Sequence, residues 1–175
     1  MNYRKPTIAE IKATSMEVGI DVAKEAIYLR GLFINRYAAV EFAIAELVSR
    51  GFLHHAYSHL GNPPLGPAKK LKRLKTMIEI NGPIAAYRSE LQQRLDEFAK
   101  YAEHRNFMVH AIMVPAGKSN ITFKLYDHRE GVYSAGVLQL EFTDLRTIAG
   151  LLSSLSVEFT SLVSKMCRDI PLPVA

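Results

Sequence analysis

Apolar residues between positions 26 and 47 recur at intervals of three and four, and this rhythm constrains the fold more than any other feature of the chain. Such intervals place side chains along one face of an α-helix. They predict a helix from about Asp21 to Arg50 that ends at Gly51 and buries one face against other elements. The members of the rhythm are Ala26, Leu29, Phe33, Tyr37, Val40, Ile44 and Leu47.

Three more stretches predict long or short helices. A capping pattern that begins at Thr7 predicts a short helix over residues 7–18. A second apolar rhythm predicts a helix over 84–113, and a third predicts one over 143–166. The second rhythm starts with Leu91, Leu95, Phe98 and Ala102, and the third includes Leu145, Ile148, Leu152, Leu155, Phe159, Leu162 and Met166.

Between the last two of these helices the hydrophobic period falls to two. Ile121, Phe123 and Leu125 alternate with polar residues, residues 127–131 are typical of a turn, and residues 132–142 alternate again. We therefore predict one β-hairpin over 118–142. The expected fold is mainly all-α, a bundle of four to five helices with this inserted hairpin, in a single domain over 1–175 with its core at about 19–167.

The composition is that of a globular protein, with 49% hydrophobic and 22% charged residues. Because no apolar run reaches about 18 residues, we expect no membrane span. The first residues lack the apolar region of a signal peptide. The single Cys167 leaves no intramolecular disulfide, which is typical of a reducing cytoplasm.

Polar residues interrupt the second rhythm in the stretch AEHRNFMVHAI, residues 102–112. If the apolar face continued, Arg105, Asn106 and Val109 would lie on it, with His110 at its edge and His104 exposed. Burying polar groups without partners costs several kcal/mol. These groups therefore require a partner, an interface or a substrate, and the alternative is a salt-bridged polar cluster in the core.

The letters RNFMVH, Arg105 to His110, resemble the R-N-x-x-x-H signature of HEPN domains, a family of small helical bundles. The resemblance implies a metal-independent endoribonuclease without a cofactor, acting as a homodimer in which Arg and His of both copies line one cleft. It also implies a role as a toxin or in antiviral defence, with an antitoxin or regulatory partner. Some members have lost catalysis and serve as binding or dimerisation modules. A subset carries Tyr two places after the His, as the target of nucleotide transfer by an antitoxin, and this chain departs from it with Ile112.

The residue types suit RNA cleavage by the 2′-hydroxyl. His110 can act as the general base, since histidine ionises near neutral pH. Arg105 can stabilise charge on the phosphorane, and Asn106 can orient the imidazole or a phosphate. The products would be a 2′,3′-cyclic phosphate and a 5′-hydroxyl, and His110 of the second protomer could protonate the leaving group. Two alternatives stay open: a non-catalytic module that binds RNA or nucleotides, and a dimeric interaction protein.

A basic run lies in the segment AKKLKRLK and carries as many positive charges as the net charge of the whole chain, +5. The apolar residues Leu71, Leu74 and Ile78 form a narrow stripe on the same predicted helix, so its basic face should point outward. This face either binds RNA phosphates or is simply solvated. Its members are Lys69, Lys70, Lys72, Arg73 and Lys75.

Three histidines precede this helix in a connection over residues 54–67. His55 and His59 are four residues apart, a spacing that can bind zinc, and His54 is adjacent. No carboxylate or further ligand lies near them in the sequence, and Gly61 and several prolines follow. We therefore expect a solvated loop and no metal site.

Overall fold

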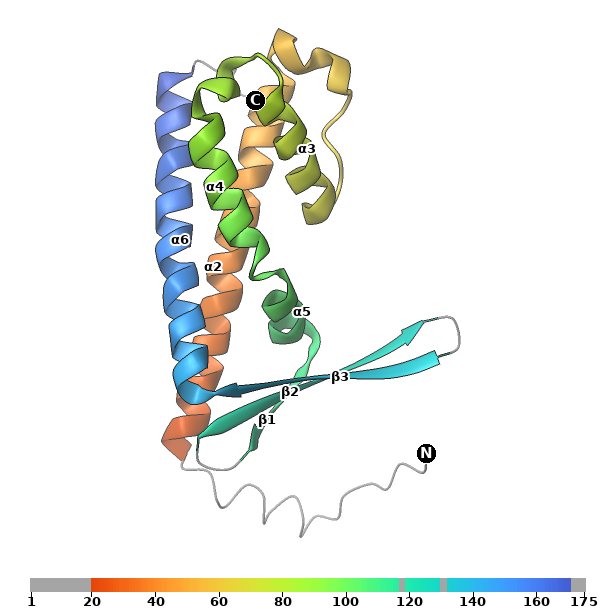
Figure 1. Cartoon of the computed structure of the whole chain (residues 1–175), viewed down its shortest axis with the longest axis vertical. Helices are drawn as coiled ribbons and strands as arrows, with labels where there is room; N and C mark the ends of the chain where they lie inside the picture. The colour runs from red at the N-terminus through yellow and green to blue at the C-terminus, as the bar shows by residue number, and fades with distance from the viewer. Residues whose placement is uncertain (1–19, 117–118, 130–131, 171–175) are drawn as a thin grey trace. The chain divides into compact units, whose positions relative to one another are not determined.

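The computed structural model describes residues 20–116, 119–129 and 132–170 (Figure 1). The chain is mainly helical and contains one small three-stranded antiparallel sheet, so the predicted fold class is confirmed at this level. The helix predicted over 7–18 lies outside the described residues. The elements are α2 (Ile20–Phe52), η1 (His55–Leu60), α3 (Pro67–Glu79), η2 (Pro83–Tyr87), α4 (Arg88–Ala99), α5 (Ala102–His110), β1 (Ile112–Ala116), β2 (Asn120–Arg129), β3 (Val132–Glu141) and α6 (Phe142–Asp169).

Contacts between residues divide the chain into two units. Among the described residues, the first unit comprises those from 20 to 33 together with those from 104 to 149, and it contains the sheet and most of α5. The second comprises Ile34–Glu103 and the described residues from Gly150 to Ile170, and it contains α3 and α4. Helices α2 and α6 each contribute residues to both units.

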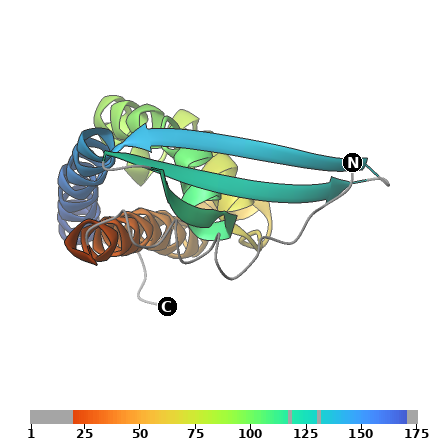
Figure 2. The same cartoon turned by 90° about the horizontal axis from the view of Figure 1, so that it is seen from below.

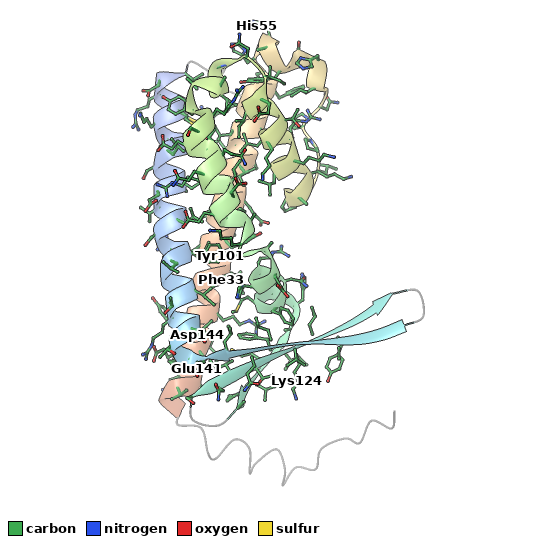
Figure 3. The ribbon with its side chains drawn as sticks, in the orientation of Figure 1. Phe33, His55, Tyr101, Lys124, Glu141 and Asp144 are labelled. Carbon is green, nitrogen blue, oxygen red and sulfur yellow. The ribbon has the colours of Figure 1, made fainter. Side chains whose placement is uncertain are left out.

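In the first unit the strands pair in the order β1-β2-β3, and β2 and β3 run side by side along their length (Figure 2). Alternation along the strands separates two faces: Ile121, Phe123 and Leu140 are buried, whereas Lys124 and Val137 are exposed. Lys124 projects from the face of the sheet away from α5 (Figure 3). The period-two pattern of the sequence is therefore that of an antiparallel sheet with one face on a core and the other in solvent.

Helix α5 packs on the sheet through an aromatic ring. A Cβ atom added to Gly136 in β3 would lie 3.2 Å from the ring of Phe107. Glycine at this position lets the ring approach the strand backbone closely.

In the second unit, helices α2, α3, α4 and α6 all contribute buried residues. Tyr37 of α2 stacks on Phe98 of α4 with 4.3 Å between ring centroids. Helices α4 and α6 are joined by an ion pair between Arg94 Nη1 and Glu158 Oε2, 2.6 Å apart. The core of this unit includes Leu47, Leu74, Met77, Ile78, Ile84, Leu91, Leu95, Phe98, Leu155 and Phe159.

Two features differ from the sequence-based prediction. The continuous helix expected over 84–113 is wrong, because a 3₁₀ turn, α4 and α5 share this stretch and Lys100 and Tyr101 separate the two α-helices. The amide groups of Lys100 and Tyr101 donate to the carbonyl groups of Glu97 and Phe98, three residues back, so the helix tightens and stops there. In addition, Met113 belongs to β1, a strand that was not predicted.

Among the described residues, α6 alone is long and apolar enough by length and composition to cross a membrane. This is weak evidence, because the core helix of a soluble protein passes the same test. Its leucines at 145, 152 and 155 are buried within the protein.

Candidate functional site

Helix α5 buries a different side from the one expected. Met108 is fully buried, whereas Val109 is 36% exposed. Asn106 and His110 are exposed, and Arg105 is half-buried. The expectation that these polar groups lie on or beside the buried face of the helix is therefore wrong for Asn106 and His110. The interruption of the helix at Lys100 and Tyr101 rotates the following residues, so that Met108 is buried in place of Val109.

The helical geometry brings Asn106 and His110 together. They are four residues apart and each points about 160° away from Met108. Glu103, three residues before Asn106, is exposed as well. Together these three side chains form an outward-facing polar row on α5.

Arg105 belongs to a different side of the helix. It points about 60° from Met108 and about 140° from His110. Arg105 takes part in an interaction within the protein. One copy of α5 therefore does not direct Arg105 and His110 at a common point.

Hydrogen bonds from α2 hold the C-terminal end of α5 in place. The Arg30 guanidinium of α2 donates from Nε to the carbonyl oxygen of Met108 at 2.6 Å and from Nη2 to that of Ala111 at 3.1 Å. The Met108 carbonyl group lies in the last turn of α5 and Ala111 is the residue after the helix, so neither carbonyl group has a helical partner. The position of His110 is thus fixed by the backbone on either side of it.

His104 differs from expectation, because it is half-buried and not exposed. Its Nδ1 is buried and, among the described residues, has no hydrogen-bond partner. The sequence placed His104 in solvent, and no signal except its place next to Arg105 marks it as half-buried.

The basic run forms α3, whose buried residues are Leu74, Met77 and Ile78. Two of its five cations are engaged: Arg73 Nη1 donates to the Gly61 carbonyl at 2.9 Å, and Lys75 pairs with Asp96 at 3.1 Å. Hydrogen bonds from Gln92 and Lys75 lower the pKa of Asp96 below its usual value.

The other three basic side chains are Lys69, Lys70 and Lys72. Lys69 and Lys72 are exposed and Lys70 is half-buried. The ion pairs and side-chain hydrogen bonds among the described residues do not engage them. These three are therefore the members of the run whose charge is open to an anion.

Of the histidines before α3, His54 caps a 3₁₀ helix, His55 begins it and His59 lies in its last turn. Nδ1 of His54 accepts from the Ala56 amide at 3.2 Å, and the rings of His54 and His55 stack with centroids 4.3 Å apart. In the part of the chain that the structure describes, no three His, Cys, Asp or Glu side chains gather as metal ligands would. His54 thus has a local structural role as a helix cap.

Comparisons of the chain with family models, with curated proteins and with solved structures find no match. The resemblance to HEPN domains therefore stays a prediction that depends on the six residues from Arg105 to His110. In the structure, the three polar residues of this motif are exposed or half-buried and do not lie in an apolar core.

Proposed function

We propose that the protein is a metal-independent endoribonuclease of the HEPN type, with a bundle of that type, and that a second copy of the chain completes its active cleft. The observation that supports this proposal is the exposure of Asn106 and His110 on one face of α5, with Arg105 on the flank of the same helix. A structural polar cluster would instead hide these side chains from solvent.

The proposed reaction uses the nucleophile that RNA carries itself. His110 takes the proton of a 2′-hydroxyl, and the oxygen attacks the adjacent phosphorus. The bond from phosphorus to the 5′-oxygen breaks, which leaves a 2′,3′-cyclic phosphate and a 5′-hydroxyl. Arg105 stabilises the negative charge that builds on the phosphorane oxygens, and Asn106 orients the imidazole or the phosphate.

A second copy is part of this proposal because Arg105 and His110 of one helix diverge. With two copies facing each other, Arg105 of one chain can meet the phosphate that His110 of the other approaches. The second His110 is then placed to protonate the 5′-oxygen as it leaves. The proposed setting is the cytoplasm, in a toxin or antiviral defence role controlled by an antitoxin or another partner.

The experiment that tests the proposal is incubation of the purified protein with mixed single-stranded RNA in EDTA. The His110→Ala variant should cleave about 10²- to 10⁴-fold more slowly than the unaltered protein, because a general base is lost. His59→Ala, which removes an exposed histidine of η1, is the matched control and should cleave normally. Cleavage products should end in a 2′,3′-cyclic phosphate, and equal rates for the His110→Ala variant and the unaltered protein would refute the assignment.

A second candidate function is a non-catalytic module that binds RNA or nucleotides. Lys69, Lys70 and Lys72 favour it, because their charges are not engaged among the described residues. Such a module would bind RNA with an affinity that falls steeply with salt, and would not cleave it.

A further inference from the structure

One side of α2 is exposed along its whole length and carries hardly any charge. We call this set of residues the outer stripe, and all of its members belong to one continuous helix. Every member is exposed except Glu46, which is half-buried, and its aromatic members Tyr28 and Phe42 are 65% and 71% exposed. The outer stripe comprises Lys24, Tyr28, Gly31, Asn35, Ala38, Phe42, Glu46 and Ser49.

The composition of the outer stripe is not that of a solvated helix face. A helix that packs one side on a core usually turns charged residues to water on the other. Here no charged residue lies on the stripe between Lys24 and Glu46. Two large exposed aromatic side chains on such a face are typical of a surface that binds another protein.

Gly31 adds an independent observation. It lies in the middle of α2, where glycine weakens a helix relative to alanine. Among the described residues, a Cβ atom at Gly31 would meet nothing within 4 Å, so packing against them does not explain the missing side chain. Close approach of a second helix backbone would explain it, as small residues do at tight helix–helix contacts.

We infer that the outer stripe is a two-fold contact between two copies of this chain, with α2 packed antiparallel on α2 and the axis at Asn35. The stripe is matched about this residue. Tyr28 and Phe42 each lie seven residues from Asn35, so each aromatic ring meets the other type in the second copy. Gly31 of the stripe and Ala39, a half-buried residue beside the stripe, each lie four residues from Asn35, so these small residues face each other as well.

The charges at the ends of the stripe select the antiparallel direction. Lys24 and Glu46 each lie eleven residues from Asn35, on opposite sides. In the antiparallel pair Lys24 of each copy faces Glu46 of the other, which gives two attractive pairs. A parallel pair would place Lys24 against Lys24 and Glu46 against Glu46.

Asn35 fits the position on the axis. A carboxamide both donates and accepts, so two copies of Asn35 can hydrogen-bond to each other. A single polar residue at an otherwise apolar helix contact fixes the register of the two helices. Asn35 would therefore oppose any sliding of one α2 along the other.

This contact goes beyond the proposed nuclease, since it uses no residue of the R-N-x-x-x-H motif. Arg30, which binds the end of α5, lies five residues before Asn35 and therefore points about 140° away from it around α2. The outer stripe and α5 thus occupy different sides of this helix. A chain that used both surfaces for self-association would form an assembly larger than a dimer, with two kinds of two-fold contact.

Cysteine cross-linking in a full-length Cys167→Ser background tests this register directly. Asn35→Cys lies on the axis and should form a disulfide-linked dimer under mild oxidation, because a disulfide needs Cα atoms within about 7 Å. Ser49→Cys is the matched control on the same stripe. Its two copies would lie about 42 Å apart, so it should stay uncross-linked.

Mixing two different cysteine variants distinguishes the proposed register from cross-linking by random collision of chains. Chains with Tyr28→Cys and chains with Phe42→Cys should cross-link to each other, and neither should cross-link to itself. Chains with Lys24→Glu should likewise prefer chains with Glu46→Lys over their own kind in native mass spectrometry, because only the mixed pair restores attraction at both ends. Far-UV circular dichroism checks that each variant folds.

Two results would overturn the inference. One is an Asn35→Cys chain that stays monomeric on oxidation, and the other is equal cross-linking of Asn35→Cys and Ser49→Cys. Both results are independent of the nuclease, since His110→Ala should abolish cleavage and leave the Asn35→Cys cross-link unchanged.

Discussion

Arg30 hydrogen-bonds to the backbone at the end of α5: its Nε donates to the Met108 carbonyl oxygen at 2.6 Å, and its Nη2 donates to the Ala111 carbonyl oxygen at 3.1 Å. One side chain from α2 thus satisfies two carbonyl groups where α5 ends. Met108 itself is fully buried, so the contact lies beside a packed region. The motif helix depends on this arginine more than on its own short length of nine residues.

Replacing Arg30 with alanine should loosen the end of α5. Hydrogen bonds from a charged donor are each worth about 1.5–3 kcal/mol, and the Arg30→Ala variant leaves two carbonyl groups without their partner. Hydrogen exchange should accelerate at the amides of α5 and β1. Arg88→Ala is the matched control, because Arg88 binds the Ile78 and Glu79 carbonyl groups at the end of α3 in the same way, at 3.0 Å each. Faster exchange confined to α3 in both variants would contradict this role for Arg30.

If the active cleft combines residues of two chains, two variants that are inactive alone should restore cleavage when they are mixed. Arg105→Ala and His110→Ala should each be inactive alone. In an equal mixture half of the dimers contain both variants, and one of their two sites combines an intact Arg105 with an intact His110 but lacks the second His110 that protonates the leaving oxygen. The mixture should therefore regain clear cleavage, at less than about a quarter of the normal rate. Mixing either chain with the Arg105→Ala/His110→Ala double variant provides the control, and an inactive first mixture would mean that each pair acts within one chain.

The open lysines of α3 should set the salt dependence of RNA binding. Each phosphate contact with a single strand contributes about 0.7 to the slope of log affinity against log salt. Lys69→Glu/Lys72→Glu should lower this slope by about 1.4 in fluorescence anisotropy titrations. Lys100→Glu/Arg168→Glu changes the net charge equally at two other exposed positions and should alter the slope much less. Equal slopes for the two double variants would make the basic run a solubility feature.

The Tyr57 hydroxyl should matter for stability. Tyr57 is 1% exposed, and its oxygen accepts from the Ile84 amide at 3.0 Å. In Tyr57→Phe this buried amide loses its acceptor, which should lower the free energy of unfolding by about 1–3 kcal/mol. Tyr126→Phe, at a 65% exposed ring, should change it by less than about 0.5 kcal/mol in the same urea titrations. Equal stability of the two variants would show that Ile84 finds another acceptor.

The ion pair between Glu25 and Arg146 should make stability depend on pH in acid. Hydrogen bonds from Arg146, at 2.5 and 2.8 Å, hold the pKa of Glu25 below its usual value. The stabilisation is thus complete above the pKa of glutamate in the unfolded chain, and it is lost as the pH falls through the lowered value. The difference in melting temperature between the unaltered protein and Glu25→Gln should be positive at pH 7 and vanish in strong acid. A difference that does not change with pH would exclude the carboxylate as its cause.

Local periodicity was sufficient to predict the long helices and the paired strands. The rhythm of Ala26, Leu29, Phe33 and Val40 corresponds to the buried side of α2, and the alternation of Ile121 and Phe123 to the buried side of β2. In both cases one side of the element meets a core along its whole length. The position of each side chain then follows from the geometry of the element alone.

The candidate site was harder to predict because its position depends on a helix break without a sequence signal. Neither glycine nor proline lies between Phe98 and Met108. Tyr101 is 9% exposed and takes the buried place that the rhythm assigned to Ala102. Packing of Tyr101 thus resets the helical phase, and the shift of one residue moves Asn106 and His110 out to solvent. Strand β1 was missed for a similar reason, since its five residues gain their partner only through tertiary pairing with β2.

Helix α5 leads directly into β1 (Figure 1), and only Ala111 separates His110, the last residue of α5, from Ile112, the first residue of β1. Ile112 is opposite Lys124 in the ladder, and Lys124 in turn is opposite Val137 in β3. His110 therefore lies within two Cα–Cα steps, about 7 Å, of the first residue of the three-stranded sheet. Any movement of β1 would have to pass to this histidine through one intervening residue, Ala111.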